Sequence, residues 1–434
     1  MKTVRECGGC LIALVAITAC GQDESWLAGA AGAGGEEGSG SAVFPFPQNR
    51  QSEHCVLPEA IDNARVLQAY DKWKEELVTG YGAAGFRRVT RPDTPDGIDF
   101  STVSEGIAYG MLLAVYFDDQ ALFDDLWQYA RVWADDGGLM NWYVDPHGQT
   151  ACPERSSCGA ATDADEDMAF ALVMADRQWG GRGSLDRPYA EHALEQIGRV
   201  REQEVMGQSD PLLDGLPLTV LKPGNRWGGY LHLNISYFAP AFYRVFAEVD
   251  AEHADEWQAL VDGCYTVIER TINAENGNLD TGLMPAWSRG NGTLATDGSA
   301  THHQYDSARI PFRIGQDYCW YGEPRAKEYL DKVSEFFVNE GAAGIYDGYD
   351  LDGTSHPDEH ASGRPSQSAV FVGSAAVGAM TDPGHAGFVQ EAYDRVATLQ
   401  LLERSRYYNL SWTAMSLATL SGNYWLLPGS QPSD

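Results

Sequence analysis

Residues 106–117, GIAYGMLLAVYF, carry no charge and are apolar on almost every side. A second stretch, AVFVGSAAVGAM at residues 369–380, has the same character. A helix that is apolar all round is expected inside a protein rather than on its surface. Residues 186–204 and 254–270 instead combine one apolar stripe with one charged face, which predicts helices on the outside.

Inner and outer patterns of this kind roughly alternate along the chain. Apolar residues recur at three- and four-residue spacing in twelve segments. These are residues 58–78, 104–117, 120–134, 163–180, 187–205, 235–249, 254–273, 305–321, 324–340, 367–381, 385–404 and 407–421. The alternation predicts an all-α fold, an (α/α)6 barrel of six helical hairpins around an axis.

Long loops separate several of these helices and are rich in Gly, Asp, Trp and Tyr. They lie at about residues 135–162, 206–234, 274–304 and 341–366. Loops of this length inside a compact domain usually carry function, so the site is expected there.

The N-terminus has the pattern of an export signal. Lys2 and Arg5 precede a short apolar run from Leu11 to Thr18, which is too short to span a bilayer as a helix. Residues 17–20, ITAC, resemble the lipobox of bacterial lipoproteins. We therefore expect a signal peptide at residues 1–19, lipidation of Cys20, and a location on the cell envelope. An ordinary cleaved signal of a secreted protein is the alternative.

The composition divides the rest of the chain into a tether and one domain. Residues 20–50 are rich in Gly, Ala, Ser and Glu and have too little apolar content to fold, which predicts a flexible tether. Residues 51–430 are expected to form the single working domain, a monomer.

The charge balance limits the partners of this domain. Lys and Arg number 30 against 62 Asp and Glu, which gives a net charge of −32. A surface this acidic repels phosphate backbones and anionic lipid. We expect no nucleic-acid partner and no membrane contact except through the lipid anchor, while neutral and cationic substrates remain open.

Five cysteines follow Cys20. Cys152 and Cys158 flank a short Pro/Ser-rich stretch and form the expected disulfide, since an exported protein can hold one. Cys264 and Cys319 lie in apolar helical patterns and are interpreted as buried thiols.

Two acidic motifs open predicted inner helices. The first is TVSEG at residues 102–106. It could be a capping box in which Thr102 and Glu105 satisfy the helix end. However, Gly106 and Gly110 leave room for a bulky group beside the acid.

The second motif, ATDADEDMA at residues 161–169, places four carboxylates in five positions. That is more than the dipole of a helix N-terminus accounts for. A calcium loop is excluded because Met168 and Met174 occupy the positions that require Gly and Glu.

Two further motifs contain residue types that can do chemistry. In YDSAR at residues 305–309, Asp306 and Arg309 could form a plain salt bridge, or the arginine could hold a general base ionised. HPDEH at residues 356–360 matches a zinc-peptidase pattern, but Pro357 argues for a loop and against zinc. Paired carboxylates acting on a sugar are the remaining interpretation, because aromatic loops suit stacking on sugar faces.

These residues resemble glycoside hydrolase family 8, in its branch of bacterial endoglucanases. The resemblance runs from about residue 56 to 426. It is carried by ATDADEDMAFALVMADRQW (161–179), SEG (104–106) with YGM (109–111), GLMNW (138–142), YDSAR (305–309), LKPGNRWGG (221–229) and SYFAP (236–240).

The resemblance implies an (α/α)6 barrel with an acidic cleft and inversion of configuration. Glu105 is then the proton donor, Asp306 the base that activates water, and Asp163 the carboxylate that grips and distorts the sugar. The further implied residues are Tyr305 and Arg309 to orient water and base, Trp142, Trp227 and Phe312 as stacking platforms, and Tyr408 to help place the water. Phe312 stands where Trp is common, and Asn225 where Asp is often found.

The expected activity is that of an inverting endo-β-1,4-glucanase, a cellulase that acts on β-1,4-linked polysaccharide without metal or cofactor. A xylanase, mixed-linkage glucanase or chitosanase of the same family is the nearest alternative. A surface polysaccharide-binding protein without catalysis belongs to another class, and a zinc peptidase is a third.

The proposed acid poses an electrostatic question. A helix N-terminus lowers the pKa of a Glu, whereas a general acid needs a raised pKa. We expect neighbouring carboxylates, Asp163 especially, to supply the rise for Glu105 through repulsion of like charges.

Overall fold

The computed structural model describes residues 42–94, 98–152, 158–356, 366–401 and 406–429. This part of the chain contains twelve α-helices, one for each predicted segment. They are α1 (Asn63–Leu77), α2 (Ser104–Tyr116), α3 (Gln120–Val132), α4 (Thr162–Trp179), α5 (Tyr189–Glu204), α6 (Pro240–Val249), α7 (Ala254–Thr271), α8 (Ile310–Tyr321), α9 (Pro324–Glu340), α10 (Ala369–Ala379), α11 (Ala386–Leu399) and α12 (Arg406–Leu420).

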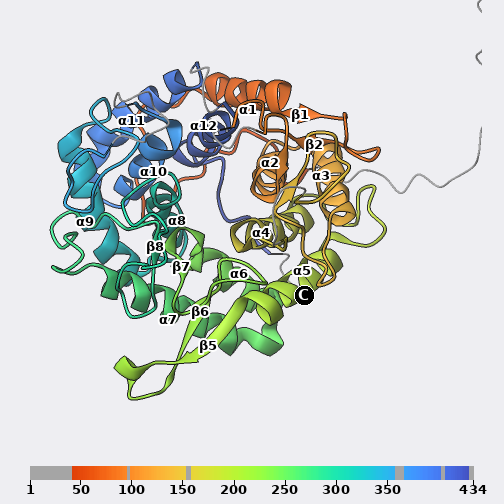
Figure 1. Ribbon diagram of the computed structural model, residues 1–434. Helices are drawn as coiled ribbons and strands as arrows, with labels where there is room; N and C mark the ends of the chain where they lie inside the picture. The colour runs from red at the N-terminus through yellow and green to blue at the C-terminus, as the bar shows by residue number, and fades with distance from the viewer. Residues whose placement is uncertain (1–41, 95–97, 153–157, 357–365, 402–405, 430–434) are drawn as a thin grey trace, which may run out of the picture. The chain divides into compact units, whose positions relative to one another are not determined.

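The even-numbered helices form an inner ring and the odd-numbered helices surround it (Figure 1). Each inner helix contacts the next one along the chain, and α12 contacts α2, so the ring closes. Among the outer helices, α3 packs on α2, α5 on α4, α7 on α6, α9 on α8, α11 on α10 and α1 on α12. The predicted (α/α)6 barrel is confirmed.

The composition of the inner helices explains their position. Every residue of α10 is buried, and Glu105 is the one residue of α2 that is not. Small residues let the inner helices approach closely. A Cβ at Gly373 of α10 would lie 2.6 Å from the Cβ of Ser416 on α12. Burial on all sides requires the uncharged sequences from which the fold was predicted.

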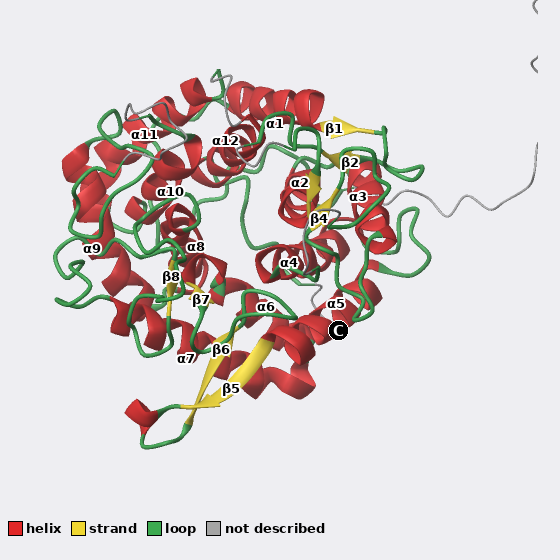
Figure 2. Ribbon diagram, in the orientation of Figure 1, coloured by secondary structure: helices red, strands yellow, loops and turns green. Residues whose placement is uncertain are grey.

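The described parts of the loops contain four two-stranded antiparallel sheets (Figure 2). The pairs are β1 (Val78–Thr79) with β2 (Arg88–Val89), β3 (Thr102–Val103) with β4 (Tyr143–Val144), β5 (Val205–Ser209) with β6 (Pro217–Leu221), and β7 (Leu233–Asn234) with β8 (Trp287–Ser288). β3 leads directly into α2, so its pairing with β4 fixes the entrance to the helix that carries Glu105.

Three helices, α1, α6 and α8, begin five residues later than the sequence predicts. Short 3-10 turns at Ile235–Tyr237 and Ser307–Arg309 precede α6 and α8, and each of these helices has a proline in its first turn. α1 begins at Asn63 because the carboxylate of Asp62 accepts hydrogen bonds from the first backbone N–H groups.

The end of the predicted tether packs against the barrel. Phe46 stacks on Phe117 with ring centroids 4.9 Å apart, and Phe44 meets Trp425 edge-on. Two aromatic rings within residues 42–50 thus attach a stretch that the composition assigned to the tether. Residues 1–41, including the signal-like segment and Cys20, lie outside the described residues.

The cysteines follow the prediction in part. Cys152 and Cys158 form a disulfide, and Cys264 is a buried free thiol, as expected. The prediction for Cys319 is wrong, because it forms a disulfide with Cys55, 264 residues away. This bridge ties the segment before α1 to the C-terminal turn of α8. None of the helices in the described ranges has the length and apolar character needed to cross a bilayer.

Candidate active site

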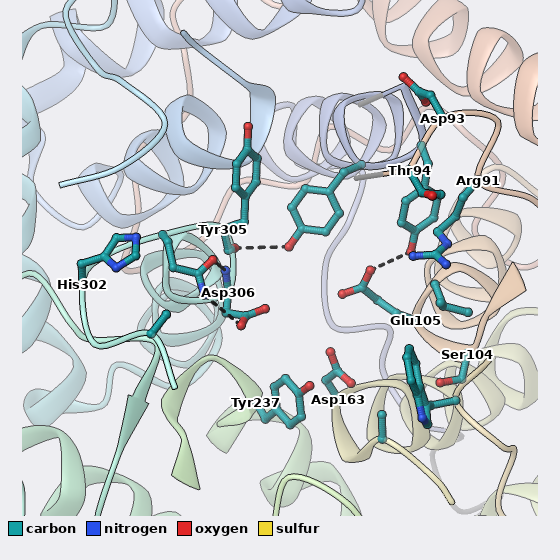
Figure 3. A pocket seen from close by; sticks show the side chains of 17 residues that line it. Arg91, Asp93, Thr94, Ser104, Glu105, Asp163, Tyr237, His302, Tyr305 and Asp306 are labelled. Carbon is teal, nitrogen blue, oxygen red and sulfur yellow. Dashed lines mark hydrogen bonds between the residues drawn. The ribbon is translucent and has the colours of Figure 1, made fainter. Parts of the chain in front are cut away.

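An open pocket of about 600 Å³ lies where the inner helices begin (Figure 3). Inner helices and the turns before them supply Ser104, Glu105, Asp163, Tyr237, Asp306, Tyr407 and Tyr408. Loops add Arg91, Asp93, Thr94, Trp142, His302, Gln304 and Tyr305. The acidic side chains point into this space from different sides, and we take it as the candidate active site.

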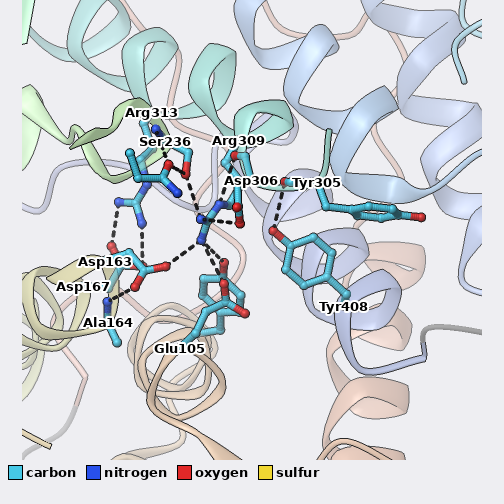
Figure 4. Close-up of polar contacts among 12 residues, drawn as sticks. Glu105, Asp163, Ala164, Asp167, Ser236, Tyr305, Asp306, Arg309, Arg313 and Tyr408 are labelled. Carbon is cyan, nitrogen blue, oxygen red and sulfur yellow. Dashed lines mark hydrogen bonds and ion pairs between the residues drawn. The ribbon is translucent and has the colours of Figure 1, made fainter. Parts of the chain in front are cut away.

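Arg309 is the centre of a polar network that joins Glu105, Asp163 and Asp306 of this pocket (Figure 4). Its guanidinium is 1% exposed, and Nη1 donates to Oε2 of Glu105 at 2.8 Å and to Oδ2 of Asp163 at 2.7 Å. Nη2 donates to Oγ of Ser236 at 2.8 Å and reaches Oδ1 of Asp306 at 3.4 Å. One buried cation therefore gathers all three predicted catalytic carboxylates.

The entrance to α2 excludes the capping-box alternative for Glu105. Thr102 donates its hydroxyl to the carbonyl of Val89 and accepts from Arg88, so its side chain does not cap the helix. The residue before α2 is Val103, whose side chain makes no capping hydrogen bond to the helix. Glu105 is left to face the pocket with 20% of its side chain exposed.

Glu105 has the electrostatics of a general acid. Burial raises its pKa to about 7, the positive charge of Arg309 opposes this rise, and Asp163 and Asp306 add to it. The sequence hypothesis gave the main role to Asp163. Its charge contributes as expected, but loss of hydration is the larger cause.

Asp306 occupies a more open position. Its side chain is 35% exposed, and Oδ2 accepts a hydrogen bond from the amide of Gln304 at 3.0 Å. The hydroxyl of Tyr408 donates to the backbone carbonyl of Tyr305 at 3.3 Å. The phenol of Tyr305 itself donates to Asp347 at 2.8 Å. Asp306 can thus meet water inside the pocket.

The acidic motif on α4 divides its carboxylates among different partners. Asp163 faces the pocket and accepts from Arg309, whereas Asp167 pairs with the buried Arg313 at 2.8 Å. Glu166 accepts from the hydroxyl of Tyr243 at 2.7 Å. Asp165 points away from the pocket and interacts with Glu204 of α5. The acidic residues of this motif thus lie both in the pocket and in the structure that supports it.

The three predicted stacking residues lie in different surroundings. Trp142 lines the pocket. Trp227 is 39% exposed beside Trp287, outside the residues that line the pocket. Phe312 is only 4% exposed and packs edge-on against Trp412 at 5.1 Å. The stacking role predicted for Phe312 is contradicted, because neither ring face is open to a sugar.

Ser236 and Gln304 had no predicted role, but Ser236 accepts from Arg309 and Gln304 donates to Asp306, one of the predicted catalytic carboxylates. One tyrosine of the pair at residues 407–408, Tyr408, was expected to help place the water, and Tyr407 had no role of its own, whereas Tyr407 donates to Glu105. Ser236 lies in the SYFAP motif, so a signal was available for it. Among the described residues, no group of three or more His, Cys, Asp or Glu side chains could hold a metal ion. Most of the HPDEH motif lies outside them.

The fold and the paired carboxylates define a glycoside hydrolase. The chain belongs to glycosyl hydrolases family 8, whose sequence model matches residues 46–421. It is 37% identical to Endoglucanase A of Acetivibrio thermocellus over 83% of this chain and 70% of that protein. It is 36% identical to Endoglucanase 2 of Ruminiclostridium josui over 89% of this chain and 78% of that protein.

Solved structures show the same barrel. The apo structure of a β-1,3-1,4-glucanase from Paenibacillus sp. X4 matches with a TM-score of 0.73 at 24% identity, over 89% of this chain and 100% of that one. Rex8A from Paenibacillus barcinonensis, complexed with xylose, matches with a TM-score of 0.68 at 20% identity, over 84% and 94% of the two chains. At these identities the likeness concerns the fold.

Proposed function

We propose that this protein is an inverting endo-β-1,4-glucanase. The observation that carries the proposal is the single buried guanidinium of Arg309, which holds Glu105, Asp163 and Asp306 around an open pocket. Relatives that are named endoglucanases support the choice of β-glucan as substrate.

The chemistry follows from the positions of the carboxyl groups. Glu105 donates its proton to the glycosidic oxygen as the bond to the anomeric carbon breaks and its electron pair passes to that oxygen. Water attacks the anomeric carbon from the opposite face and gives its proton to Asp306. Inversion requires roughly 6.5–9.5 Å between the two carboxyl groups. Glu105 and Asp306 lie on different elements with Arg309 between them, which suits this requirement.

Asp163 is the residue that grips the sugar at the cleavage point. Its carboxylate is held on one side by the backbone N–H of Ala164 and on the other by Arg309. A carboxylate fixed in this way can accept hydrogen bonds from sugar hydroxyls without moving. Trp142 offers the ring in the pocket for stacking.

Replacement of the acid and the base tests the assignment. Glu105→Gln and Asp306→Asn should each lower kcat on β-glucan by about 10²- to 10⁴-fold, because each removes a proton-transfer group. Glu202→Gln, which changes an exposed glutamate on α5, is the control and should keep full turnover. Circular dichroism checks the fold. Near-normal turnover in either site variant contradicts the proposal.

A panel of carboxymethylcellulose, mixed-linkage glucan, xylan and chitosan separates the alternatives within the family. We expect the highest kcat/KM on a β-glucan, with products of several lengths from internal cleavage. The strong negative charge would favour cationic chitosan by attraction alone. Preference for chitosan or xylan would overturn the substrate assignment, and binding without cleavage would favour the non-catalytic class.

We also propose that the chain is exported and anchored to the cell envelope through lipid on Cys20. The support is the basic and apolar pattern of residues 1–19, which ends at the lipobox-like ITAC. Cys20→Ala should move the protein from the membrane fraction to the soluble fraction. An unchanged distribution contradicts the lipid anchor.

A further inference from the structure

The two oxygens of Glu105 have neighbours with different hydrogen-bonding abilities. Oε2 accepts from Nη1 of Arg309 at 2.8 Å, and Oε1 accepts from the hydroxyl of Tyr407 at 2.7 Å. A guanidinium has donors only, whereas a phenol can donate or accept. A proton on Oε2 would face a group that cannot accept it. A proton on Oε1 meets a hydroxyl that can turn and accept.

We propose that Tyr407 is a positioning residue for the general acid, one that keeps the acidic proton on Oε1 of Glu105 and donates back to this oxygen when the proton leaves. The proposal rests on the proposed glucanase function. In the step itself, the bond from Oε1 to hydrogen breaks as the glycosidic oxygen takes the proton. The negative charge left on Oε1 then receives the hydrogen bond from Tyr407.

The contact between Tyr407 and Glu105 is built into the packing of α2 and α12. Tyr407 is buried in the first turn of α12, and its ring lies over Gly106, the residue after the acid. A Cβ at position 106 would lie 2.9 Å from the ring carbon Cε2 and 3.3 Å from the hydroxyl oxygen. Glycine inside a helix is less favourable than alanine. Glycine at position 106 leaves room for the phenol of Tyr407 to reach the carboxyl group of Glu105.

The hydrogen bond from Tyr407 changes the pKa of Glu105. Donation from Tyr407 stabilises the ionised form of Glu105 and so lowers the pKa of this carboxyl, against the larger rise that burial causes. The other charged or titratable groups that interact with Glu105 are Arg309, Asp163, Asp306, Tyr109, Tyr237 and Tyr408. Removal of the Tyr407 hydroxyl should therefore raise the pKa of Glu105 further.

Tyr407→Phe tests the proposal because it removes the hydroxyl and keeps the ring. A hydrogen bond to a charged group is lost, so kcat on β-glucan should fall about 10- to 100-fold with little change in KM. The general acid works when protonated, so activity is lost as pH rises through its pKa. The alkaline limb of the pH–rate profile should therefore move to higher pH. Gly106→Ala should move it in the same direction by displacing the phenol.

A second substrate separates an effect on the acid from structural damage. A dinitrophenyl β-cellobioside has a leaving group that needs little protonation, so Tyr407→Phe should be far less impaired on it than on β-glucan. Tyr408→Phe is the matched control. It removes the neighbouring hydroxyl, which bonds the backbone of Tyr305, and its deficit should be similar on both substrates with an unmoved alkaline limb.

The outcomes distinguish the two proposals. A wild-type protein that cleaves no polysaccharide overturns the proposed function. An active wild type whose Tyr407→Phe variant keeps its alkaline limb, or is equally impaired on both substrates, overturns the role of Tyr407 alone. In a Glu105→Gln background, Tyr407→Phe should have no further effect on kcat, and a full additional loss would also contradict the role.

Discussion

At the scale of single residues, the site depends on unequal environments for chemically similar groups. Glu105 is largely buried and its pKa is raised to about 7, while Asp306 stays partly exposed to the pocket. An acid and a base of the same chemical type can therefore take different roles. Arg309 touches both, so it fixes their relative position without making them equivalent.

The charge of Asp163 should affect the pH dependence of catalysis. This carboxylate raises the pKa of Glu105, so its neutralisation in Asp163→Asn should lower that pKa. Since the acid works when protonated, the alkaline limb of kcat/KM should move to lower pH, the opposite direction from Tyr407→Phe. An unmoved limb in the pH–rate profile would show that Asp163 has no electrostatic influence on the acid.

At the scale of helices and strands, the fold is set by close packing within the inner ring. The contact of α10 with α12 depends on Gly373, whose missing Cβ makes room for Ser416. The same helix α12 carries Tyr407 and Tyr408 into the pocket. Packing in the ring and geometry of the site are therefore linked through this helix.

Gly373→Ala should lower the free energy of unfolding by about 1–3 kcal/mol, because the added Cβ would overlap the Cβ of Ser416 and force α12 to shift. The control is Gly387→Ala on the outer helix α11, where no heavy atom lies within 4 Å of the new Cβ. That variant should be neutral or up to about 1 kcal/mol more stable. Urea denaturation of both measures the difference, and equal effects would contradict the packing argument.

The helices could be predicted from sequence because an uncharged run such as residues 369–380 is stable only when surrounded by protein. The β1–β2, β3–β4 and β7–β8 sheets could not be predicted, since a ladder of two residue pairs has no measurable alternation. The Cys55–Cys319 bridge joins positions 264 residues apart, and sequence spacing gives no information on such a pairing.

The candidate site was predictable in its carboxylates but less so in its surroundings. Glu105, Asp163 and Asp306 lie together as expected because each stands at the start of an inner helix or in the turn before it. The stacking role of Phe312 was predicted wrongly because a sequence motif does not show which face of α8 is turned toward the pocket. The role of Tyr407 was missed because its contact with Glu105 depends on how α12 meets α2.

At the scale of the whole molecule, buried carboxyl groups connect stability to pH. Glu204, the last residue of α5, lies beside Asp165, and burial raises its pKa from 4.5 to about 8. In the unfolded chain this group releases its proton near its ordinary value. Between these two pH values the folded protein holds a proton that the unfolded chain has lost, so stability falls as pH rises.

Glu204→Gln should therefore flatten the loss of stability between about pH 4.5 and pH 8, because glutamine has no proton to release. Thermal unfolding across this range gives the comparison. Glu202→Gln, an exposed neighbour on the same helix, should keep the wild-type slope. Parallel slopes for Glu204→Gln and wild type would show that Glu204 is ionised in the folded protein.

We propose that Glu105 and Asp306 act as acid and base from opposite sides of a glycosidic bond, with one water molecule admitted between Asp306 and the sugar. Proton NMR of the first products released from a cello-oligosaccharide tests this most directly, because it reads the anomer formed before mutarotation. We expect the α-anomer at the new reducing end. Initial release of the β-anomer would require a covalent intermediate and would contradict it.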